Sequence, residues 1–343
     1  MIGAGAISQE HLGFLSESDQ AEIVAVCDRS LTMARFAADR FGATHALADH
    51  QQLLADLRPQ VVHVLTPPHT HVQLVTDCLE AGADVIVEKP VAPTHAEFDQ
   101  LWSLAQQRDC RLTEDHNYRF NRPILNIEHR LAEGELGAVR EVEVRLAMQI
   151  RKPGNRYADA NLPSPSHRLP GGVVQEFITH LCYLTLRFLP TFEHVAAAWN
   201  KHGGGNIFKY DDLDAIVIGG PVHARIRFTC HTQPDCFTVT VRGTRGTAHT
   251  DLFLPHLLIT TRRGAGPLTP VLNQYQAGRT LKRAAWTNLK NKVLRRTSYE
   301  GLHTFLRRTY QALRGECDLP VTYEDMERTS RLIEALLDEE NRI

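Results

Sequence analysis

A short β-branched run ends on a carboxylate, an amine and a proline, Glu88-Lys89-Pro90. The preceding residues 85–87 have the composition of a strand that is covered on both faces of a parallel sheet. Ligands of open α/β sheets bind at the carboxyl ends of such strands. A lysine held at that edge can donate hydrogen bonds or serve as a tuned acid or base. Taken alone, a charged turn after a strand more often has no chemical role.

A glycine-rich turn opens the chain, where Gly3-x-Gly5 leads into a helical pattern. In the dinucleotide fingerprint the first glycine permits a tight turn, and the second lets the backbone approach a pyrophosphate that faces the helix N-terminus. Ser8 stands where a third glycine or alanine is usual. Asp28 ends the next strand about 20 residues later, where a carboxylate accepts a hydrogen bond from a ribose 2′-hydroxyl. Its charge favours NAD, Arg29 leaves NADP open, and an ordinary turn residue is the alternative for Asp28.

A third group of polar residues lies in the helical pattern of residues 171–188. Glu176 and His180 are four residues apart and Tyr183 follows three residues later, so all three share one face of a helix. A carboxylate that orients a histidine is an arrangement for proton transfer. The alternative, a packed helix with a hydrogen-bonded histidine, is the commoner case for such a pattern alone.

The first ~115 residues alternate strand-like and helical segments, which predicts a parallel sheet with right-handed crossovers. Thr70 and Thr94 both begin sequences of the capping-box type. The expected strands are 23–27, 61–66, 85–87 and 111–115, and the expected helices are 31–41, 72–81 and 96–108.

The strand that should precede Gly3 is almost missing, because only Met1 and Ile2 stand before it. That strand is the central one of a 3-2-1-4-5-6 sheet, and its absence would leave two neighbouring strands with unpaired edges. Our hypothesis is that the start of the sequence is truncated.

Beyond residue 118 the pattern changes to strands separated by glycine-rich turns, which predicts a mostly antiparallel sheet. A helix at 171–188 lies within this region, and Thr322 precedes a final helix at 323–340. We therefore expect a nucleotide-binding domain at 1–117 and a substrate and oligomerisation domain at 118–343, and leave open whether the final helix packs back on the first domain. The expected strands are 139–150, 194–199, 214–219, 222–230, 237–241 and 257–261.

The composition excludes several classes of protein. The 343 residues carry a formal net charge of −2, which gives no general field for binding nucleic acid. The seven cysteines are odd in number and form no C-x-x-C pair, which indicates free thiols in a reducing compartment and neither a disulfide frame nor a zinc site. We find no signal peptide and no apolar run that could span a bilayer, so we expect a soluble cytoplasmic protein without a bound metal.

Residues 279–296 are unusual because they contain seven Lys or Arg and no Asp or Glu. Apolar Leu281, Ala285, Leu289 and Val293 recur at intervals of four. One interpretation is an interfacial helix on anionic lipid. The other, which we favour on sequence grounds, is the solvated face of a helix that packs on the sheet or on a neighbouring subunit.

Together these motifs resemble the glucose–fructose oxidoreductase / inositol dehydrogenase / MocA family, over essentially the whole chain apart from the missing first strand. The motifs that carry the resemblance are Gly3-x-Gly5, Thr66-Pro67, Glu88-Lys89-Pro90, Asn117-Tyr118-Arg119-Phe120, and Gly171-Gly172 with His180.

The resemblance implies an α/β fold: an N-terminal Rossmann domain, and a C-terminal α/β domain whose large open, mostly antiparallel sheet often serves oligomerisation. Members are mostly NAD(P)-dependent dehydrogenases of sugars, nucleotide sugars and cyclitols, and some use the same redox step for elimination or glycoside cleavage. We expect a homo-oligomer that oxidises a secondary alcohol or reduces its ketone. The alternatives are a redox-assisted lyase or glycosidase with tightly bound cofactor, and a cofactor-binding sensor without turnover.

The resemblance also implies roles for single residues. Lys89 would anchor the reacting oxygen and His180 would exchange its proton, with Glu176 as the third catalytic residue. The family usually has Asp in place of Glu176 and often Asp in place of Tyr183, which puts the polyol-recognition pattern in doubt. The residues expected to bind the cofactor are Gly3, Gly5, Ala6, Ile7, Asp28, Arg29, Thr66, His71, Glu88, Lys89 and Arg119.

Overall fold

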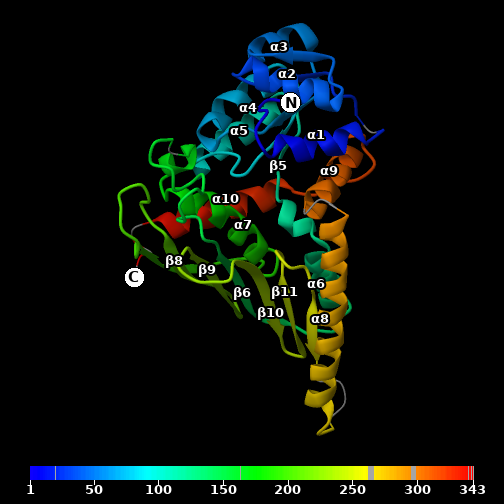
Figure 1. Ribbon diagram of the computed structural model, residues 1–343, viewed down its shortest axis with the longest axis vertical. Helices are drawn as coiled ribbons and strands as arrows, with labels where there is room; N and C mark the ends of the chain where they lie inside the picture. The colour runs from blue at the N-terminus through cyan, green and yellow to red at the C-terminus, as the bar shows by residue number, and fades with distance from the viewer. Residues whose placement is uncertain are drawn as a thin grey trace. The chain divides into compact units, whose positions relative to one another are not determined.

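The computed structural model describes residues 1–19, 21–162, 164–261, 266–294, 299–338, 340 and 342. The chain divides into two compact units, whose elements are drawn in Figure 1. Unit 1 consists of Met1–Asn117 and Gly301–Glu334, and unit 2 of Tyr118–Glu300 and Ala335–Ile343. Nearly all of α9 (Glu300–Leu313) and most of α10 (Tyr323–Leu337) therefore belong to the unit formed by the N-terminal part of the chain.

Unit 1 has the alternating strands and helices that the sequence predicts. Its strand pairs β1–β2, β3–β4 and β4–β5 are all parallel. The short strand β2 was not predicted. The strands are β1 (Ala25–Cys27), β2 (His45–Leu47), β3 (Val61–Val64), β4 (Asp84–Val87) and β5 (Leu112–Glu114), and the helices between them are α1 (Ser8–Ser16), α2 (Leu31–Phe41), α3 (His50–Leu57), α4 (His71–Glu80) and α5 (His95–Gln107).

The first three residues of the chain hold the central position of this sheet. Ile2 forms parallel bridges to both Cys27 of β1 and Val64 of β3. The N–H of Ile2 donates to the carbonyl of His63, and the N–H of Leu65 donates to the carbonyl of Ile2, each at 2.8 Å. The resulting order, β2-β1-(residues 1–3)-β3-β4-β5, matches the order 3-2-1-4-5-6 of a Rossmann sheet. Residues 1–3 thus lie between β1 and β3, the two strands whose edges were expected to be unpaired.

Local signals account for several element ends. The Thr94 hydroxyl accepts from the N–H of Glu97 and the Glu97 carboxylate accepts from the N–H of Thr94, so the predicted capping box of α5 is present. At Thr70 that prediction is wrong, because its hydroxyl donates to the carbonyl of Pro67 and does not cap α4. Helix α2 ends at Gly42, whose φ of 77° suits a residue without a side chain.

Unit 2 contains a seven-stranded sheet in the order β12-β11-β10-β6-β9-β8-β7. The pair β6–β9 is parallel and the other five pairs are antiparallel. The prediction of a large, mostly antiparallel sheet is confirmed, although β11 was not predicted. The strands are β6 (Val139–Ala147), β7 (His194–Asn200), β8 (Asp212–Gly219), β9 (Val222–Thr229), β10 (Cys236–Gly243), β11 (Gly246–Asp251) and β12 (Leu258–Thr261).

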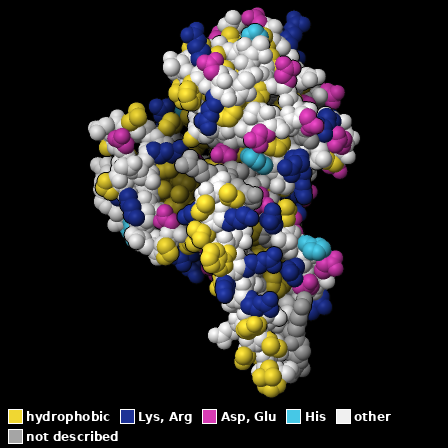
Figure 2. Space-filling model, turned by 45° about the vertical axis from the view of Figure 1, so that its right-hand side comes forward, with side chains coloured by type: hydrophobic (Ala, Val, Ile, Leu, Met, Phe, Trp, Pro, Cys, Tyr) yellow, Lys and Arg dark blue, Asp and Glu magenta, His cyan; other side chains and the backbone are white. Residues whose placement is uncertain are grey.

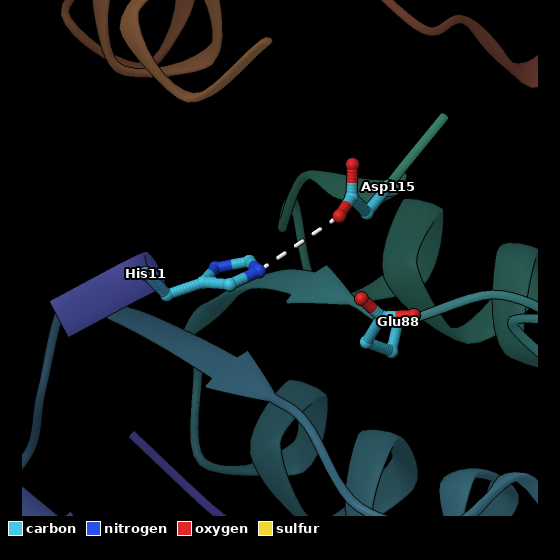
Figure 3. A group of neighbouring side chains, drawn as sticks. All are labelled: His11, Glu88 and Asp115. Carbon is cyan, nitrogen blue, oxygen red and sulfur yellow. Dashed lines mark ion pairs between the residues drawn. The ribbon is translucent and has the colours of Figure 1, made fainter. Parts of the chain in front are cut away.

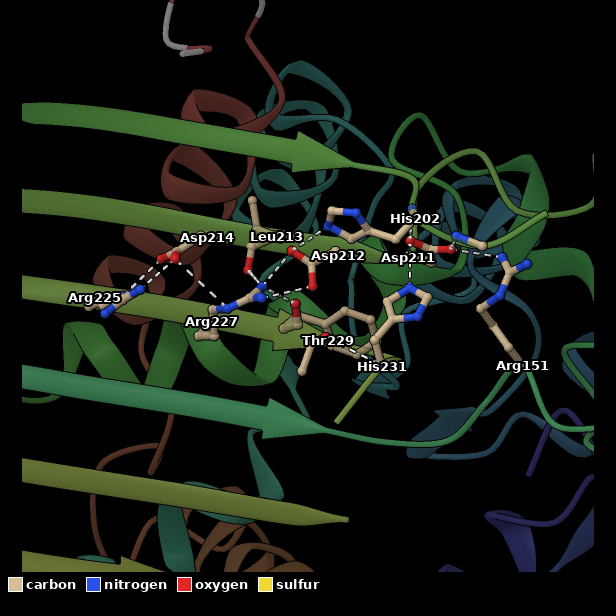
Figure 4. A network of polar contacts seen from close by, with 12 residues as sticks. Arg151, His202, Asp211, Asp212, Leu213, Asp214, Arg225, Arg227, Thr229 and His231 are labelled. Atoms are coloured by element: carbon tan, nitrogen blue, oxygen red, sulfur yellow. Dashed lines mark hydrogen bonds and ion pairs between the residues drawn. The ribbon is translucent and has the colours of Figure 1, made fainter. Parts of the chain in front are cut away.

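Charged side chains cross-link strands β8 and β9 (Figure 4). Arg227 binds both carboxylate oxygens of Asp212, and Arg225 binds both of Asp214. Just before β8, the carboxylate of Asp211 lies 2.9 Å from both Arg151 and His231. Bidentate arginine–carboxylate pairs fix geometry as well as charge, so this network holds the register of the two strands.

Helix α7 (Val173–Leu186) packs on β6 and β9, and unit 2 also contains α6 (Arg122–Ala132) and α8 (Thr269–Val293). Residues 295–296 of the predicted basic segment lie outside the described residues. Within α8, Leu281, Leu289 and Val293 are exposed, and the helix contacts strand β12 of the sheet. In the described part of the chain, no helix has the length and apolar character needed to cross a membrane.

Candidate nucleotide-binding and catalytic sites

The two glycines of the first turn are required for different reasons. Gly3 has a φ of 101°, and a Cβ atom there would lie 2.7 Å from the carbonyl oxygen of Leu65, so the fold itself excludes a side chain. At Gly5 an added Cβ would have no described protein atom within 4 Å. Since packing does not demand a glycine at position 5, its absent side chain suits the close approach of a ligand, as the dinucleotide fingerprint requires.

The N-terminus of α1 follows this turn directly. Gly5 and Ala6 are exposed, and Ile7 is the N-cap residue without a side-chain hydrogen bond to the helix. The first N–H groups of a helix have no partner within it and carry partial positive charge. The predicted contacts of Ala6 and Ile7 with a pyrophosphate therefore fit the local geometry.

Asp28 lies half-buried at the end of β1. One carboxylate oxygen accepts from the N–H of Ala4 and the other from the N–H of Ser30, each at 2.8 Å. A carboxylate has about four acceptor positions, so Asp28 retains capacity for ribose hydroxyls while it fixes the glycine turn. Arg29 is exposed beside it. These residues fit a dinucleotide whose adenosine ribose lies against β1.

Thr66 and His71 belong to the loop and helix after β3. The ring of His71 is buried, with Nε2 2.7 Å from the carbonyl oxygen of Thr66 and Nδ1 2.8 Å from that of Pro90. Burial lowers the pKa of His71, and the two carbonyl contacts act in the opposite direction. This side chain ties the loop after β3 to the loop after β4, so it positions both loops at the carboxyl edge of the sheet.

Glu88 and Lys89 follow β4 directly, and the peptide bond between Lys89 and Pro90 is cis. The backbone N–H of Lys89 donates to the Glu88 carboxylate at 3.2 Å. Residues 85–87 are all buried, as expected for a strand covered on both faces. The partly buried Lys89 thus stands at the sheet edge where parallel α/β folds bind ligands.

A buried polar cluster lies beside this turn (Figure 3). His11 of α1, Glu88 and Asp115 place one nitrogen or oxygen each within 4.8 Å of the others, and His11 Nε2 is 3.8 Å from the Asp115 carboxylate. The other ring nitrogen of His11 lies 2.9 Å from Nδ1 of His63, whose Nε2 is 2.9 Å from the Tyr310 hydroxyl. The structure describes no hydrogen-bond partner for His11 Nε2 or for either Asp115 oxygen.

The cluster has the electrostatics of a proton-holding site. Burial raises the pKa of Glu88 and of Asp115 to about 7 each, and burial lowers the pKa of His11 to about 4. Two buried carboxyl groups that face each other favour sharing one proton. The same imidazole and carboxylates are also ligand types for a first-row divalent cation. The cluster could therefore hold a proton or a cation. The sequence motifs did not bring these three residues together.

In unit 2, the two predicted catalytic residues of helix α7 are its only partly exposed positions. Twelve of its 14 residues are buried, and the two that are not are Glu176 and His180. His180 Nδ1 lies 2.8 Å from the hydroxyl of Tyr183, which in turn accepts from the N–H of Tyr118 at 3.2 Å. The ring of Tyr118 packs edge-on against His180, with centroids 4.9 Å apart.

This contact permits either neutral tautomer of His180. If the Tyr183 hydroxyl donates to Nδ1, then Nε2 carries the proton and can donate a hydrogen bond. If Nδ1 donates to the phenol oxygen, then Nε2 presents a lone pair and can accept a proton. A carboxylate at position 183 would accept only and would fix the second tautomer. Tyrosine at position 183 therefore leaves both neutral tautomers available, and in the second one Nε2 can take up a proton and return it from the imidazolium.

Glu176 has other described partners. One carboxylate oxygen accepts from the Tyr157 hydroxyl at 2.8 Å and the other accepts from the Ser166 hydroxyl. Arg156 lies 3.7 Å from the same carboxylate. Burial and Glu176 raise the pKa of Tyr157. The contact that orients His180 in the described structure comes from Tyr183, and Glu176 organises the segment that contains Tyr157 and Ser166.

Arg119 differs from the other predicted cofactor residues because it belongs to unit 2. It lies in the short helical turn Asn117–Phe120 and is largely buried, with its guanidinium 5.8 Å from the Phe120 ring centre.

Sequence reasoning missed several polar residues near the predicted ones. Asp115 follows β5 as Glu88 follows β4, and this strand-end position was the available signal. His63 and Tyr310 are 247 residues apart, so no local pattern could join them. The residues in question are His11, His63, Asp115, Tyr157, Ser166 and Tyr310.

The fold and the glycine turn of unit 1 define a Rossmann-type nucleotide-binding domain. Residues 1–116 match the model of the oxidoreductase family with an NAD-binding Rossmann fold, GFO_IDH_MocA. The predicted resemblance to the glucose–fructose oxidoreductase / inositol dehydrogenase / MocA family is thus confirmed, with the family model covering residues 1–116. The predicted cofactor, NAD, is confirmed at the level of this fold.

Among curated proteins, D-glucoside 3-dehydrogenase of Escherichia coli (strain K12) is 30% identical over 155 residues, 45% of this chain and 43% of that protein. Trans-1,2-dihydrobenzene-1,2-diol dehydrogenase of Bos taurus is 26% identical over 254 residues, 72% of each chain. The chain spans about half the length of the curated relatives that it matches first.

Solved structures share the fold over nearly the whole chain. The WlbA dehydrogenase from Bordetella pertussis, in complex with NADH and UDP-GlcNAcA, has a TM-score of 0.77 at 17% identity and covers 98% of this chain and 92% of its own. Levoglucosan dehydrogenase, in complex with NADH and levoglucosan, has a TM-score of 0.78 at 17% identity, with coverage of 99% and 95%.

Proposed function

We propose that the chain is an NAD-dependent dehydrogenase that transfers a hydride between nicotinamide and a secondary alcohol or ketone of a sugar, nucleotide sugar or cyclitol. The observation that carries the proposal is the match of residues 1–116 to an NAD-binding oxidoreductase family, in a chain that retains Lys89 directly after β4. The fit of Gly3, Gly5 and Asp28 to a dinucleotide supports the same cofactor.

The substrate class rests on relatives. One relative is named a D-glucoside dehydrogenase, and two similar structures are bound to levoglucosan or to UDP-GlcNAcA. Each of these compounds is a sugar or a sugar derivative. A sugar-like substrate offers several hydroxyls, which suits the polar set of Glu176, Tyr157, Ser166 and Arg156 in unit 2. We therefore propose that this set helps to recognise substrate hydroxyls, with Glu176 as its central acceptor.

The roles of the catalytic residues follow from their chemistry. Bound NAD supplies the hydride acceptor. The Lys89 ammonium would donate a hydrogen bond to the reacting oxygen and favour its alkoxide character. His180 would accept the hydroxyl proton at Nε2 while Nδ1–H donates to Tyr183, and in the reverse direction it would return that proton.

We also propose that the chain forms a homo-oligomer through the outer face of the seven-stranded sheet. Ile216 of β8 is 48% exposed on this sheet, beside the exposed Arg225–Asp214 pair. Light scattering of the purified protein tests this proposal, because Ile216→Lys should lower the measured mass if that face is the contact.

The experiment that tests the reaction is an absorbance screen at the NADH band against polyols, glycosides and nucleotide sugars. The screen includes Lys89→Ala and His180→Ala variants, with bound NAD measured separately for each. We expect activity with at least one sugar, losses of about 10²–10⁴-fold in kcat/KM for each variant, and retained NAD binding. Wild-type activity that both variants retain would contradict the assigned roles.

A further inference from the structure

Helix α8 contacts its own sheet through small and polar side chains. The amides of Asn273 and Asn288 donate to the carbonyl oxygens of Thr261, at 3.1 Å, and Pro255, at 3.3 Å. None of the 25 residues of α8 is buried. The partly buried positions recur at helical spacing and are Thr269, Asn273, Ala277, Thr280, Ala284, Asn288 and Asn291. The packing of α8 on the sheet thus uses almost none of its large apolar side chains.

The large apolar residues of α8 lie on the opposite face. The spacing of five of them places them on one stripe of the helix. These five are between 52% and 72% exposed: Val271, Tyr275, Trp286, Leu289 and Val293. Leu272 and Leu281, which are 56% and 45% exposed, lie on either side of that stripe. A surface helix of a globular protein normally turns such a stripe toward the core. In α8 this arrangement is inverted, so the stripe is available to something outside the chain.

Every formal charge on this helix is positive. Arg279, Lys282, Arg283, Lys290 and Lys292 are exposed or nearly so, and residues 252–299 contain no Asp or Glu. Figure 2 shows basic and hydrophobic side chains interleaved over the long helix. The partner of this face must therefore accept apolar side chains and carry negative charge at the same time.

Charge complementarity separates the possible occupants. A second copy that packed α8 against α8 about a two-fold axis would bring five cations toward five more, which is unfavourable. The phosphates of a nucleic acid would pair with the basic side chains. They would offer no apolar surface for the valine and leucine side chains. The headgroup region of an anionic bilayer satisfies both requirements, since apolar side chains enter the acyl boundary and Lys and Arg meet the lipid phosphates.

We propose that α8 binds the surface of anionic lipid membranes through the apolar and basic face defined above. The helix would lie in the plane of the interface without crossing the bilayer, in agreement with its mixed composition. The inference does not depend on the proposed reaction, because α8 contains none of the residues assigned to it.

Flotation of the full chain with lipid vesicles tests the proposal. We expect binding to vesicles of equal parts phosphatidylglycerol and phosphatidylcholine, at least about tenfold weaker binding to phosphatidylcholine alone, and loss of binding at high salt. Lys282→Gln combined with Arg283→Gln should weaken binding about tenfold. Trp286→Ser combined with Leu289→Ser should do the same through lost apolar contact.

Matched controls lie elsewhere on the surface. Arg140→Gln combined with Lys201→Gln removes two exposed charges, and Phe36→Ser removes an exposed apolar side chain; both should bind vesicles as the wild type does. Lys89→Ala should also bind normally, which separates this proposal from the proposed function. Equal binding to both vesicle types, no binding, or unchanged binding by the α8 variants would overturn it. A solution dimer that Trp286→Ser dissociates, without vesicle binding, would also overturn it.

Discussion

His180 and Tyr183, one helical turn apart on α7, are joined by a 2.8 Å contact between Nδ1 and the phenol oxygen. The same oxygen accepts from the backbone N–H of Tyr118. Since the phenol can donate and accept, it fixes the direction of the imidazole without fixing its tautomer. This arrangement suits a residue that gives up a proton in one direction of a reaction and takes it back in the other.

Removing the phenol oxygen should affect catalysis more than cofactor binding. Tyr183→Phe leaves His180 without this partner and leaves the N–H of Tyr118 without its described acceptor, which together cost on the order of 1–3 kcal/mol. We expect kcat/KM to fall about tenfold or more, while the NAD dissociation constant stays unchanged. Tyr210→Phe, elsewhere in unit 2, is the matched control for steady-state kinetics. A Tyr183→Phe variant with wild-type kinetics would remove Tyr183 from the mechanism.

The two glycines of the first turn predict a separation of stability from binding. Gly3→Ala puts a Cβ atom 2.7 Å from a carbonyl oxygen at positive φ, so it should lower the free energy of unfolding by about 2 kcal/mol or more. Gly5→Ala meets no described protein atom and should change stability by less than about 0.5 kcal/mol. It should nevertheless weaken NAD binding about tenfold. Calorimetry measures both the unfolding of each variant and its affinity for NAD. Normal NAD binding by Gly5→Ala would contradict the prediction.

The charge of Asp28 should make the chain bind NAD more tightly than NADP. Asp28→Ser removes a charge that repels a 2′-phosphate and an acceptor for the ribose hydroxyl, so NAD should bind about tenfold more weakly. NADP should gain relative to NAD because Arg29 remains beside the site. The measurement is the ratio of the two dissociation constants, and the combined Asp28→Ser and Arg29→Ala change should cancel the gain. An unchanged ratio would show that Asp28 only fixes the turn through Ala4 and Ser30.

The carboxyls of Glu88 and Asp115 predict a pH dependence of stability. Burial raises both pKa values to about 7, so the folded chain holds more protons than the unfolded chain between about pH 4 and pH 7. Their contribution to stability therefore falls as pH rises through this window and is constant above it. Glu88→Gln should gain stability relative to the wild type between about pH 5 and pH 8, by on the order of 2–3 kcal/mol.

Denaturant unfolding at several pH values measures this difference. Glu135→Gln alters a half-exposed carboxylate paired with Arg130 and should show no such gain, which makes it a suitable control. If the Glu88→Gln and wild-type curves run parallel with pH, the pair does not hold a proton in this range.

Much of the fold follows from local sequence signals. The run at 85–87 is buried on both faces as its β-branched composition predicts, and helix α2 begins and ends where its pattern and Gly42 place it. The short strand β2 has no such signal, because His45–Leu47 is only three residues long and partly exposed. The central segment was also unpredictable, since two bridges at Ile2 depend on β1 and β3 being already in place.

The candidate sites divide in the same way. Helical spacing put Glu176 and His180 on one face of α7, where they are the only two residues of the helix that are not buried. The described partners of Glu176, however, are Tyr157 and Ser166 from the preceding loop, and no periodic pattern assigns a loop its contacts. His11 and His63 meet in the core through elements that are 52 residues apart. Such contacts are fixed by tertiary packing, which a single sequence does not encode in any short motif.

Hydride transfer itself is tested most directly by the formation of NADH. The purified chain, mixed with NAD and each member of a panel of sugars, nucleotide sugars and cyclitols, should produce NADH in amounts that exceed the protein concentration many times over for at least one compound. Lys89→Ala should lower that rate about 10²-fold or more while it still binds NAD. A protein that binds NAD tightly but forms no NADH with any of these compounds would contradict the assignment as a dehydrogenase.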